Sequence, residues 1–264
     1  GYTANLLALK PAVGFNLSSD TRINVVYKIE NLDVTAVGTS EVLKQDLGKS
    51  TRSLIDLSLR HDKRNSIIKP TKGYMIKFGS EIAGLGGDEQ FVKTTASGKI
   101  YQGIYRNNII LSSELEGGFL TMGKGYSKIV DRFQLGGRSF RGFKYSGIGP
   151  RERSGGSFTI PLGGEKYAIA RVAASFPLGL PRELGLFGSV FAEAGTLWSL
   201  KTDPNVSGLS TNIALTDRSL RTSIGFAMNW ETPIGPLQFN WSRPQKYLEA
   251  DSLEYFSLNL ATRF

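Results

Sequence analysis

The sequence has no cysteine and only one histidine among its 264 residues. Without cysteine, the chain can form neither a disulfide framework nor a thiolate site. The single histidine, His61, cannot supply the histidine clusters typical of metal sites. It is also the one histidine that could serve as the base of a serine–histidine catalytic pair. The composition therefore predicts no metal and no cofactor.

The sequence also lacks any apolar run near the roughly 18 to 20 residues that a membrane-spanning helix requires. This absence does not exclude a membrane β-barrel, since the strands of such a barrel need only about 9 to 11 residues with every second one apolar. The formal charge of +9 would suit phosphates of nucleic acid or lipid, but the basic residues are scattered, which argues against nucleic acid. The start Gly1-Tyr2-Thr3, without a leader, is typical of a mature or excised piece.

What the chain does have is alternation of large apolar with small or polar residues. Over 220–231, the even positions from Leu220 to Trp230 are mostly large and apolar, and the odd positions are small or polar. A period of two recurs, strongly or weakly, at 5–17, 22–30, 53–62, 73–84, 90–104, 107–119, 165–176, 184–197, 237–242 and 255–264. The pattern predicts an all-β protein of about eleven antiparallel strands, without a helix.

The connections between these segments alternate in length. Short turns on one side and long loops on the other are typical of an outer-membrane barrel, and the long loops here are 33–49, 120–163 and 199–217. A soluble sandwich or lipocalin-like barrel would also alternate. The number of strands, the loop asymmetry and the final Phe264 together favour the transmembrane β-barrel.

Two pairs of residues suggest catalysis at first sight. His61 and Asp62 could form a polar pair, but they follow a strand on the short-turn side, and no serine stands in a nucleophile context. Glu114 and Glu116 have the spacing to form a glycosidase pair, yet a water-filled lumen explains two acids on one strand face equally well. The sequence therefore predicts no enzyme, and a passive pore stays open at this point.

The stretch "QLGGRSFRGFKYSGIGPR", residues 134–151, lies within the longest predicted loop. A loop of this length is usually functional or disordered. This one combines glycines, which permit sharp turns, with aromatic anchors, so it is predicted to be ordered: Gly136, Gly137, Gly142, Phe140 and Phe143. Between them stands Arg141, whose guanidinium would need a carboxylate if the loop folded into a barrel.

The segment 184–197 offers such a carboxylate. Its alternation places Phe191 and Glu193 as adjacent inward positions, able to present a ring and a charge to one arginine. From parity alone, this contact and a solvated Arg141 are equally favoured.

These residues carry a family resemblance. "LGGRSFRGFKYSGIGPR" resembles the sixth extracellular loop of the BamA family, outer-membrane barrels that insert and fold other β-barrel proteins. "FAEAGTLW", "SIGFAMNWETPIGPLQFNWSRPQK" and "FSLNLATRF" extend the resemblance over 130–264, and "RNSIIKPTKGYMIKFG" resembles a turn and strand pair before that loop.

The resemblance implies functional positions. The tip Arg141-Gly142-Phe143 would fold into the lumen and dock on an aromatic residue and an acid, here Phe191 and Glu193. A second acid that relatives often carry falls at Ser175, which puts a two-acid clamp in doubt. The last strand, 253–264, would hold half of the family's lateral gate and its recognition signal, at Phe256, Leu258, Leu260 and Phe264.

The resemblance also implies an organisation. Family members have a sixteen-stranded barrel and periplasmic POTRA domains, so residues 1–264 are expected to be the C-terminal part of a barrel domain, with 121–163 as a long extracellular loop folded inward. The expected partners are outer-membrane lipids, unfolded β-barrel clients and, through POTRA domains absent from this chain, assembly-complex lipoproteins. TamA-like factors and two-partner secretion translocators, which have a similar loop, remain alternatives.

Overall fold

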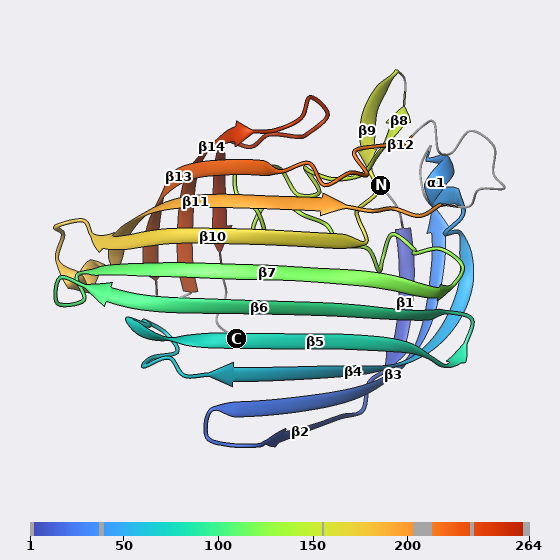
Figure 1. The fold of residues 1–264 in the computed structure, drawn as a ribbon, viewed down its shortest axis with the longest axis horizontal. Helices are drawn as coiled ribbons and strands as arrows, with labels where there is room; N and C mark the ends of the chain where they lie inside the picture. The colour runs from blue at the N-terminus through green and yellow to red at the C-terminus, as the bar shows by residue number, and fades with distance from the viewer. Residues whose placement is uncertain (1–2, 37–39, 155, 203–212, 233–234, 261–264) are drawn as a thin grey trace.

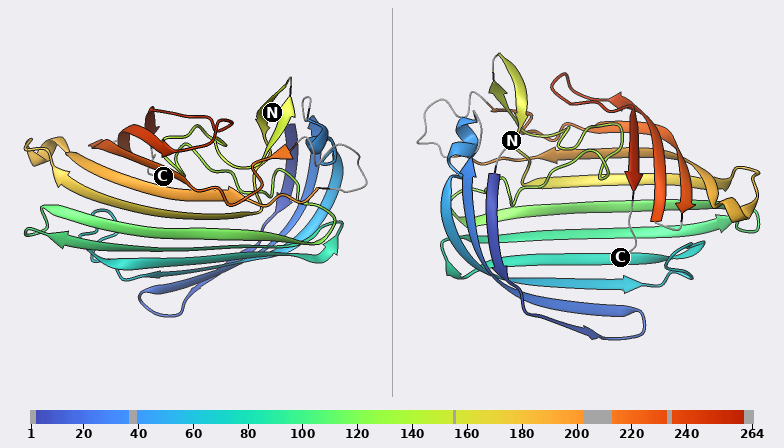
Figure 2. Two further views of the ribbon diagram at one scale, coloured as in Figure 1. Left: turned by 45° about the horizontal axis from the view of Figure 1, so that its top comes forward. Right: turned by 180° about the vertical axis from the view of Figure 1, so that it is seen from behind.

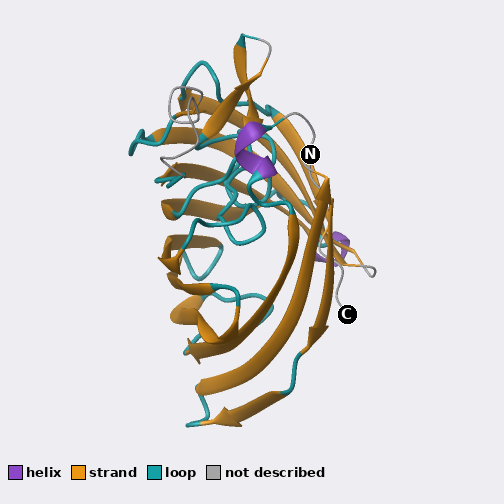
Figure 3. Cartoon of the chain, turned by 90° about the vertical axis from the view of Figure 1, so that its right-hand side faces the viewer, coloured by secondary structure: helices purple, strands orange, loops and turns teal. Residues whose placement is uncertain are grey.

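In the computed structural model, most strands of the chain form one strongly curved antiparallel sheet (Figure 1). The structure describes residues 3–36, 40–154, 156–202, 213–232 and 235–260. Seen from other sides, the sheet bends around loop segments that lie on its concave side (Figures 2 and 3). This concave face corresponds to the inner wall of the predicted barrel.

The main sheet has the order β1-β3-β4-β5-β6-β7-β10-β11-β13-β14-β15, and β2 also pairs with β3. Its strands are β1 (Thr3–Leu9), β2 (Ala12–Asn16), β3 (Thr21–Ala36), β4 (Gly48–Asp62), β5 (Lys72–Gly87), β6 (Gln90–Ile104), β7 (Ile109–Lys124), β10 (Lys166–Pro177), β11 (Leu186–Trp198), β13 (Arg221–Thr232), β14 (Gly235–Lys246) and β15 (Phe256–Leu260). A second sheet holds β8 (Arg151–Ser154), β9 (Ser157–Pro161) and β12 (Ile213–Ala214). The prediction of about eleven antiparallel strands is confirmed.

The two faces of the sheet differ because successive side chains of a strand point to opposite sides. On β11, Val190 is 47% exposed on the convex face, whereas Phe191 is 5% and Glu193 4% exposed on the concave face. Many large apolar side chains on other strands are exposed in the same way, among them Ile82, Leu115, Val172, Ile224 and Trp241. Exposed apolar residues on one face suit contact with lipid.

The predicted strand 5–17 is wrong as a single element. The chain breaks it at Pro11, so that β1 and β2 both pair with β3 over different lengths. Proline has no N–H and cannot donate to a continuous ladder.

The expectation of no helix also needs correction. One turn of helix, α1 (Glu41–Lys44), lies in the loop between β3 and β4, and a short 3-10 turn, η1 (Arg182–Leu184), precedes β11. Ser40 caps α1 by accepting a hydrogen bond from the Leu43 N–H at 3.0 Å. A single capped turn has no apolar periodicity, so the sequence pattern could not reveal it.

The loops differ from expectation in two places. The strand before the longest loop continues to Lys124, so the loop begins at 125 and carries the β8–β9 hairpin within it. On the same side of the sheet, β5 and β6 are joined by Asp88 and Glu89 alone, which breaks the predicted alternation of connection length.

Much of the packed apolar interior lies where the long loop meets the sheet. One cluster joins β3 and α1 to the loop, and a second joins the loop to β10 and β11; their central members are Leu32, Val34, Val42, Ile129 and Leu162, and Phe140, Phe143, Tyr167, Ile169 and Leu197. Across the described ranges, no helix is long and apolar enough to cross a membrane.

Candidate functional site

The tip of the long loop is a tight turn built on glycine. The N–H of Gly137 donates to the Phe143 carbonyl at 2.6 Å, which closes the turn around Arg141. Gly142 has a φ of +92°, and a Cβ at this position would lie 2.5 Å from the Ser223 Oγ. Only glycine combines this backbone conformation with so close an approach to β13.

Arg141 binds Glu193 through both side chain and backbone. Its Nε lies 2.6 Å from Glu193 Oε1 and its Nη2 lies 2.6 Å from the same oxygen, while its backbone N–H donates to Oε2 at 2.8 Å. The guanidinium also lies 3.4 Å from the centroid of the Phe191 ring. The structure thus brings Arg141, Phe191 and Glu193 together on the concave face.

This ion pair is shielded from solvent. The Glu193 side chain is 2% and the Arg141 side chain 14% exposed. Burial lowers the pKa of the Arg141 guanidinium, and the Glu193 carboxylate opposes that shift. An arginine remains charged in either case, so the loop tip carries a buried cation whose stability depends on its acidic partner.

The aromatic residues of the tip fill the space beside this pair. The rings of Phe140 and Phe143 stack with centroids 5.2 Å apart, and both side chains are fully buried. They pack in one cluster with Ile169 of β10 and Leu197 of β11. Apolar burial and an ion pair therefore hold the same turn.

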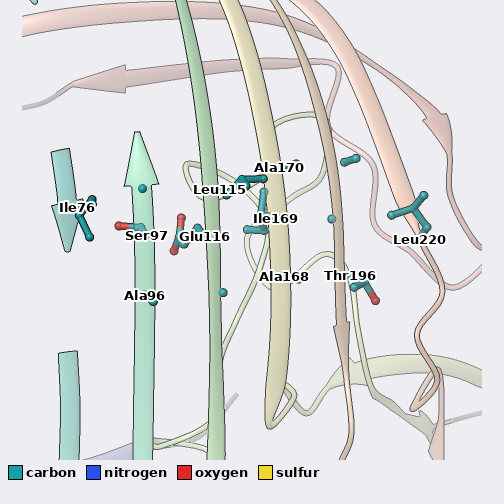
Figure 4. A pocket seen from close by; sticks show the side chains of 14 residues that line it. Ile76, Ala96, Ser97, Leu115, Glu116, Ala168, Ile169, Ala170, Thr196 and Leu220 are labelled. Atoms are coloured by element: carbon teal, nitrogen blue, oxygen red, sulfur yellow. The ribbon is translucent and has the colours of Figure 1, made fainter. Parts of the chain in front are cut away.

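A second charged residue, Arg171 on β10, lies on the wall and binds the loop. Its Nη2 donates to the Ser139 carbonyl at 2.5 Å, and its Nη1 lies 2.7 Å from Glu116 and 3.5 Å from Glu114. Figure 4 shows Glu116 on β7 beside Ser97 and Ile169 of the neighbouring strands, which are its register partners. Sequence reasoning missed Arg171, although its position, four residues before Ser175 on the same strand face, was a usable signal.

Glu114 on β7 is a further acid of this wall. It lies 3.1 Å from Lys99 and 3.5 Å from Arg171. Ser175 lines the cavity next to Arg141 but supplies no carboxylate. The wall therefore carries a row of alternating charges across β6, β7, β10 and β11.

The beginning of the loop is anchored by another buried network. Arg52 on β4 donates to Asp131 at 2.6 Å and to Glu30 on β3 at 2.7 Å. Lys128 lies 2.8 Å from Glu89, which also accepts from Arg52 at 3.4 Å. The loop is therefore tied to the wall at its start as well as at its tip.

Glu152 ties the loop to α1 on the same side. It accepts from the backbone N–H of Glu41 at 2.9 Å and from the Ser40 hydroxyl. A carboxylate at a helix N-terminus satisfies backbone donors that have no partner within the helix.

Close to the loop tip, Arg221 of β13 and Asp251 form a fully buried ion pair. Arg221 Nε lies 3.0 Å from Asp251 Oδ2, and its Nη2 donates to Oδ1 at 3.1 Å. Arg221 stands at an inward position of a well-predicted strand, but its partner lies in a connecting segment without periodicity.

The residues predicted for the C-terminal signal have the expected orientation where they are described. Phe256, Leu258 and Leu260 are exposed on the convex face of β15, and the residues between them are less exposed. Phe264 lies outside the described residues.

The residues of the two pairs considered for catalysis contact side chains of neighbouring strands. His61 Nδ1 lies 2.8 Å from the Thr21 hydroxyl, and Nε2 lies 3.4 Å from the Tyr74 hydroxyl, on the short-turn side. Glu114 and Glu116 are engaged with arginine and lysine, as described above. Within the described part of the chain, no group of three or more His, Asp or Glu residues is arranged to hold a metal ion.

The chain is similar to known proteins in both sequence and fold. A family model described as the Omp85 superfamily domain matches residues 1–264. The outer membrane protein assembly factor BamA of Neorickettsia risticii is 26% identical over 257 residues, which cover 96% of this chain and 33% of that protein. The chain therefore spans about a third of the length of this relative.

Two solved structures share the fold. A BamA structure from Haemophilus ducreyi lacking POTRA domains 1–3 has a TM-score of 0.83 at 19% identity, covering 97% of this chain and 54% of that chain. CdiB from Escherichia coli has a TM-score of 0.59 at 14% identity, covering 97% of this chain and 45% of that chain. The predictions of a BamA-like outer-membrane β-barrel fold and of an integral protein of the bacterial outer membrane are confirmed. The chain belongs to the Omp85 superfamily.

Proposed function

We propose that this chain is the membrane barrel of a factor that inserts and folds β-barrel proteins in the outer membrane. The observation that carries the proposal is the similarity to BamA of Neorickettsia risticii over 96% of the chain, together with a loop tied to the concave face by Arg141 and Glu193. The activity proposed makes and breaks no covalent bonds and uses no cofactor, so the proposal includes that the protein is not an enzyme.

In this proposal, the last strand receives client strands. Over its described residues, β15 pairs with β14 from Phe256 to Leu260 and lies at one end of the sheet order. An edge strand exposes main-chain donors and acceptors that can pair with an extended segment. The apolar convex face supplies contact with lipid, where the client strand is released.

The loop has a positioning role in the proposal. Its tip, Arg141-Gly142-Phe143, fills space on the concave side and links β10, β11 and β13 through contacts far apart in the sequence. These non-covalent contacts between strands favour a defined curvature of the wall while the edge strand exchanges partners. The proposed partners are unfolded β-barrel clients, outer-membrane lipids and assembly-complex lipoproteins that would bind periplasmic domains.

Two-partner secretion translocators, whose long loop is similar, are the second candidate. The sequence match to BamA of Neorickettsia risticii over 96% of this chain favours the assembly factor. A passive porin is the weakest candidate because an ordered loop, held by buried ion pairs, occupies the concave side.

The test is a folding assay with the full-length protein in liposomes. A urea-unfolded β-barrel client is added, and its folding is followed by the change in gel mobility that folded barrels show before heating. We expect faster folding than in empty liposomes and than in liposomes that contain a porin of similar size. Equal rates in all three would rule out the proposed function, and secretion of a cognate passenger instead of folding would favour the translocator.

A further inference from the structure

The outer edge of β15 has a definable set of main-chain groups. The N–H of Ser242 donates to the Tyr255 carbonyl at 2.8 Å, which makes this pair a hydrogen-bonded pair of the β14–β15 ladder. Hydrogen-bonded and non-hydrogen-bonded pairs alternate in an antiparallel ladder. Following the register, Leu237 and Leu260 form a non-hydrogen-bonded pair, so the Leu260 N–H and carbonyl point away from β14.

One of these outward groups is occupied by the long loop. Arg138, three residues before the docked Arg141, donates from Nη2 to the Leu260 carbonyl at 3.0 Å. Arg138 is exposed, whereas Arg141 is buried against Glu193. The two arginines of the tip thus act at different places, one on the wall and one at the strand edge.

The loop also holds the chain just before β15. The N–H of Glu254 donates to the Gly142 carbonyl at 2.9 Å, and the N–H of Ser252 donates to the Gly147 carbonyl at 2.9 Å. Phe143 forms an isolated antiparallel bridge with Leu253. The loop therefore contacts the segment that leads into β15 and, through Arg138, the far end of the same strand.

We propose that Arg138 blocks the outer edge of β15. Its guanidinium binds the outward Leu260 carbonyl, and a strand that adds to β15 must displace this guanidinium. The inference rests on the proposed function, in which β15 receives client strands. Strand addition needs the main-chain acceptors of the edge. A charged donor binds a carbonyl more strongly than a neutral N–H does, but at an exposed site it exchanges readily with a competitor. Arg138 thus makes edge pairing conditional on how the loop is docked.

The first experiment measures strand capture by the full-length protein in liposomes. Since the chain has no cysteine, L258C would supply the only thiol of this part of the barrel at the edge strand. The probe is a synthetic copy of β13, residues 221–232, with one added cysteine, and the readout is the yield of the mixed disulfide. We expect Arg138→Ala to raise the yield about threefold, because the peptide no longer competes with the guanidinium.

Lys124→Ala is the matched control, since it removes an exposed cation at the end of β7, directly before the same loop, and should leave the yield unchanged. A yield for Arg138→Ala equal to that of the control, or lower than that of the parent protein, overturns the inference. A scrambled polar peptide with the same cysteine reports the background of disulfide formation.

A second measurement does not depend on clients. Spin labels at Tyr145 in the loop and at Leu258 give a distance distribution that should broaden in Arg138→Ala and stay narrow in Lys124→Ala. An unchanged width in Arg138→Ala would overturn the inference. If no variant captures the peptide but the distribution broadens, then the strand-receiving role of β15 is wrong, while the restraint by Arg138 stands.

Discussion

Arg171 and Glu193 face each other across the β10–β11 ladder, and both bind the same loop. Arg171 donates to the Ser139 carbonyl, and Glu193 accepts from Arg141. The wall thus offers the loop a cation for a backbone acceptor and an anion for a side-chain cation, on neighbouring strands. This arrangement makes the contribution of each partner separable by mutation.

Breaking the tip pair should be costly. Arg141→Glu places two carboxylates together in a buried site, and we expect a loss of about 3–5 kcal/mol in the free energy of unfolding. Adding Glu193→Arg should restore part of that loss. A double-mutant cycle in chemical denaturation of the full-length protein checks the coupling, and additive losses would argue against the contact.

Arg171 is expected to matter for loop docking more than for the barrel itself. Arg171→Ala leaves the Ser139 carbonyl without this donor and removes one cationic partner from Glu114 and from Glu116, which should raise the protease sensitivity of the loop severalfold while the strands stay folded. Limited proteolysis followed by mass analysis of the fragments measures this. Lys77→Ala on β5, away from the loop contacts, is the control, and cleavage at the same rate in both variants would contradict the docking role.

Gly142 offers a matched comparison with Gly156. Their φ angles are +92° and +91°, so alanine is strained equally at both, but only at Gly142 does the new Cβ meet another side chain, the Ser223 Oγ at 2.5 Å. We expect Gly156→Ala to cost about 1 kcal/mol and Gly142→Ala about 1–3 kcal/mol more. Thermal or denaturant unfolding of the two variants gives the difference; equal costs would mean that the tip does not pack against β13.

The loop start should depend on Arg52. Arg52→Leu leaves the buried Asp131 without its cation and leaves Glu30 with Lys10 alone, at 3.2 Å, and we expect a loss of about 3–5 kcal/mol. Amide hydrogen exchange should show faster opening of residues 125–135, with little change at the tip. If exchange at the tip rises equally, then the two anchors form one cooperative unit instead of two.

The fully buried pair of Arg221 and Asp251 permits a comparable test. Asp251→Asn removes the charge but keeps the size, so it isolates the electrostatic part, and we expect a loss of about 3–5 kcal/mol because Arg221 is left as an uncompensated buried cation. The double variant Arg221→Met with Asp251→Asn should be more stable than Asp251→Asn alone. A double variant that is less stable would contradict an electrostatic cause.

Several features were accessible from the sequence because they repeat. Alternation over segments such as 220–231 and 184–197 predicted the strands and placed Phe191 and Glu193 on one face. The glycines and aromatic residues around Arg141 predicted an ordered loop. Local features that break a pattern were harder to predict: Pro11 divides a strand that alternation alone would continue, and α1 is too short to show a helical period.

The fold class, the two faces of the sheet and the residues able to dock a loop follow from the order of amino acids, since side-chain direction in a strand follows from parity alone. Which partners meet depends on the tertiary structure. Arg171 with Ser139, Arg52 with Asp131, and Arg138 with the Leu260 carbonyl join segments far apart in the chain. Their pairing depends on sheet curvature and on the path of the loop, which no local pattern encodes.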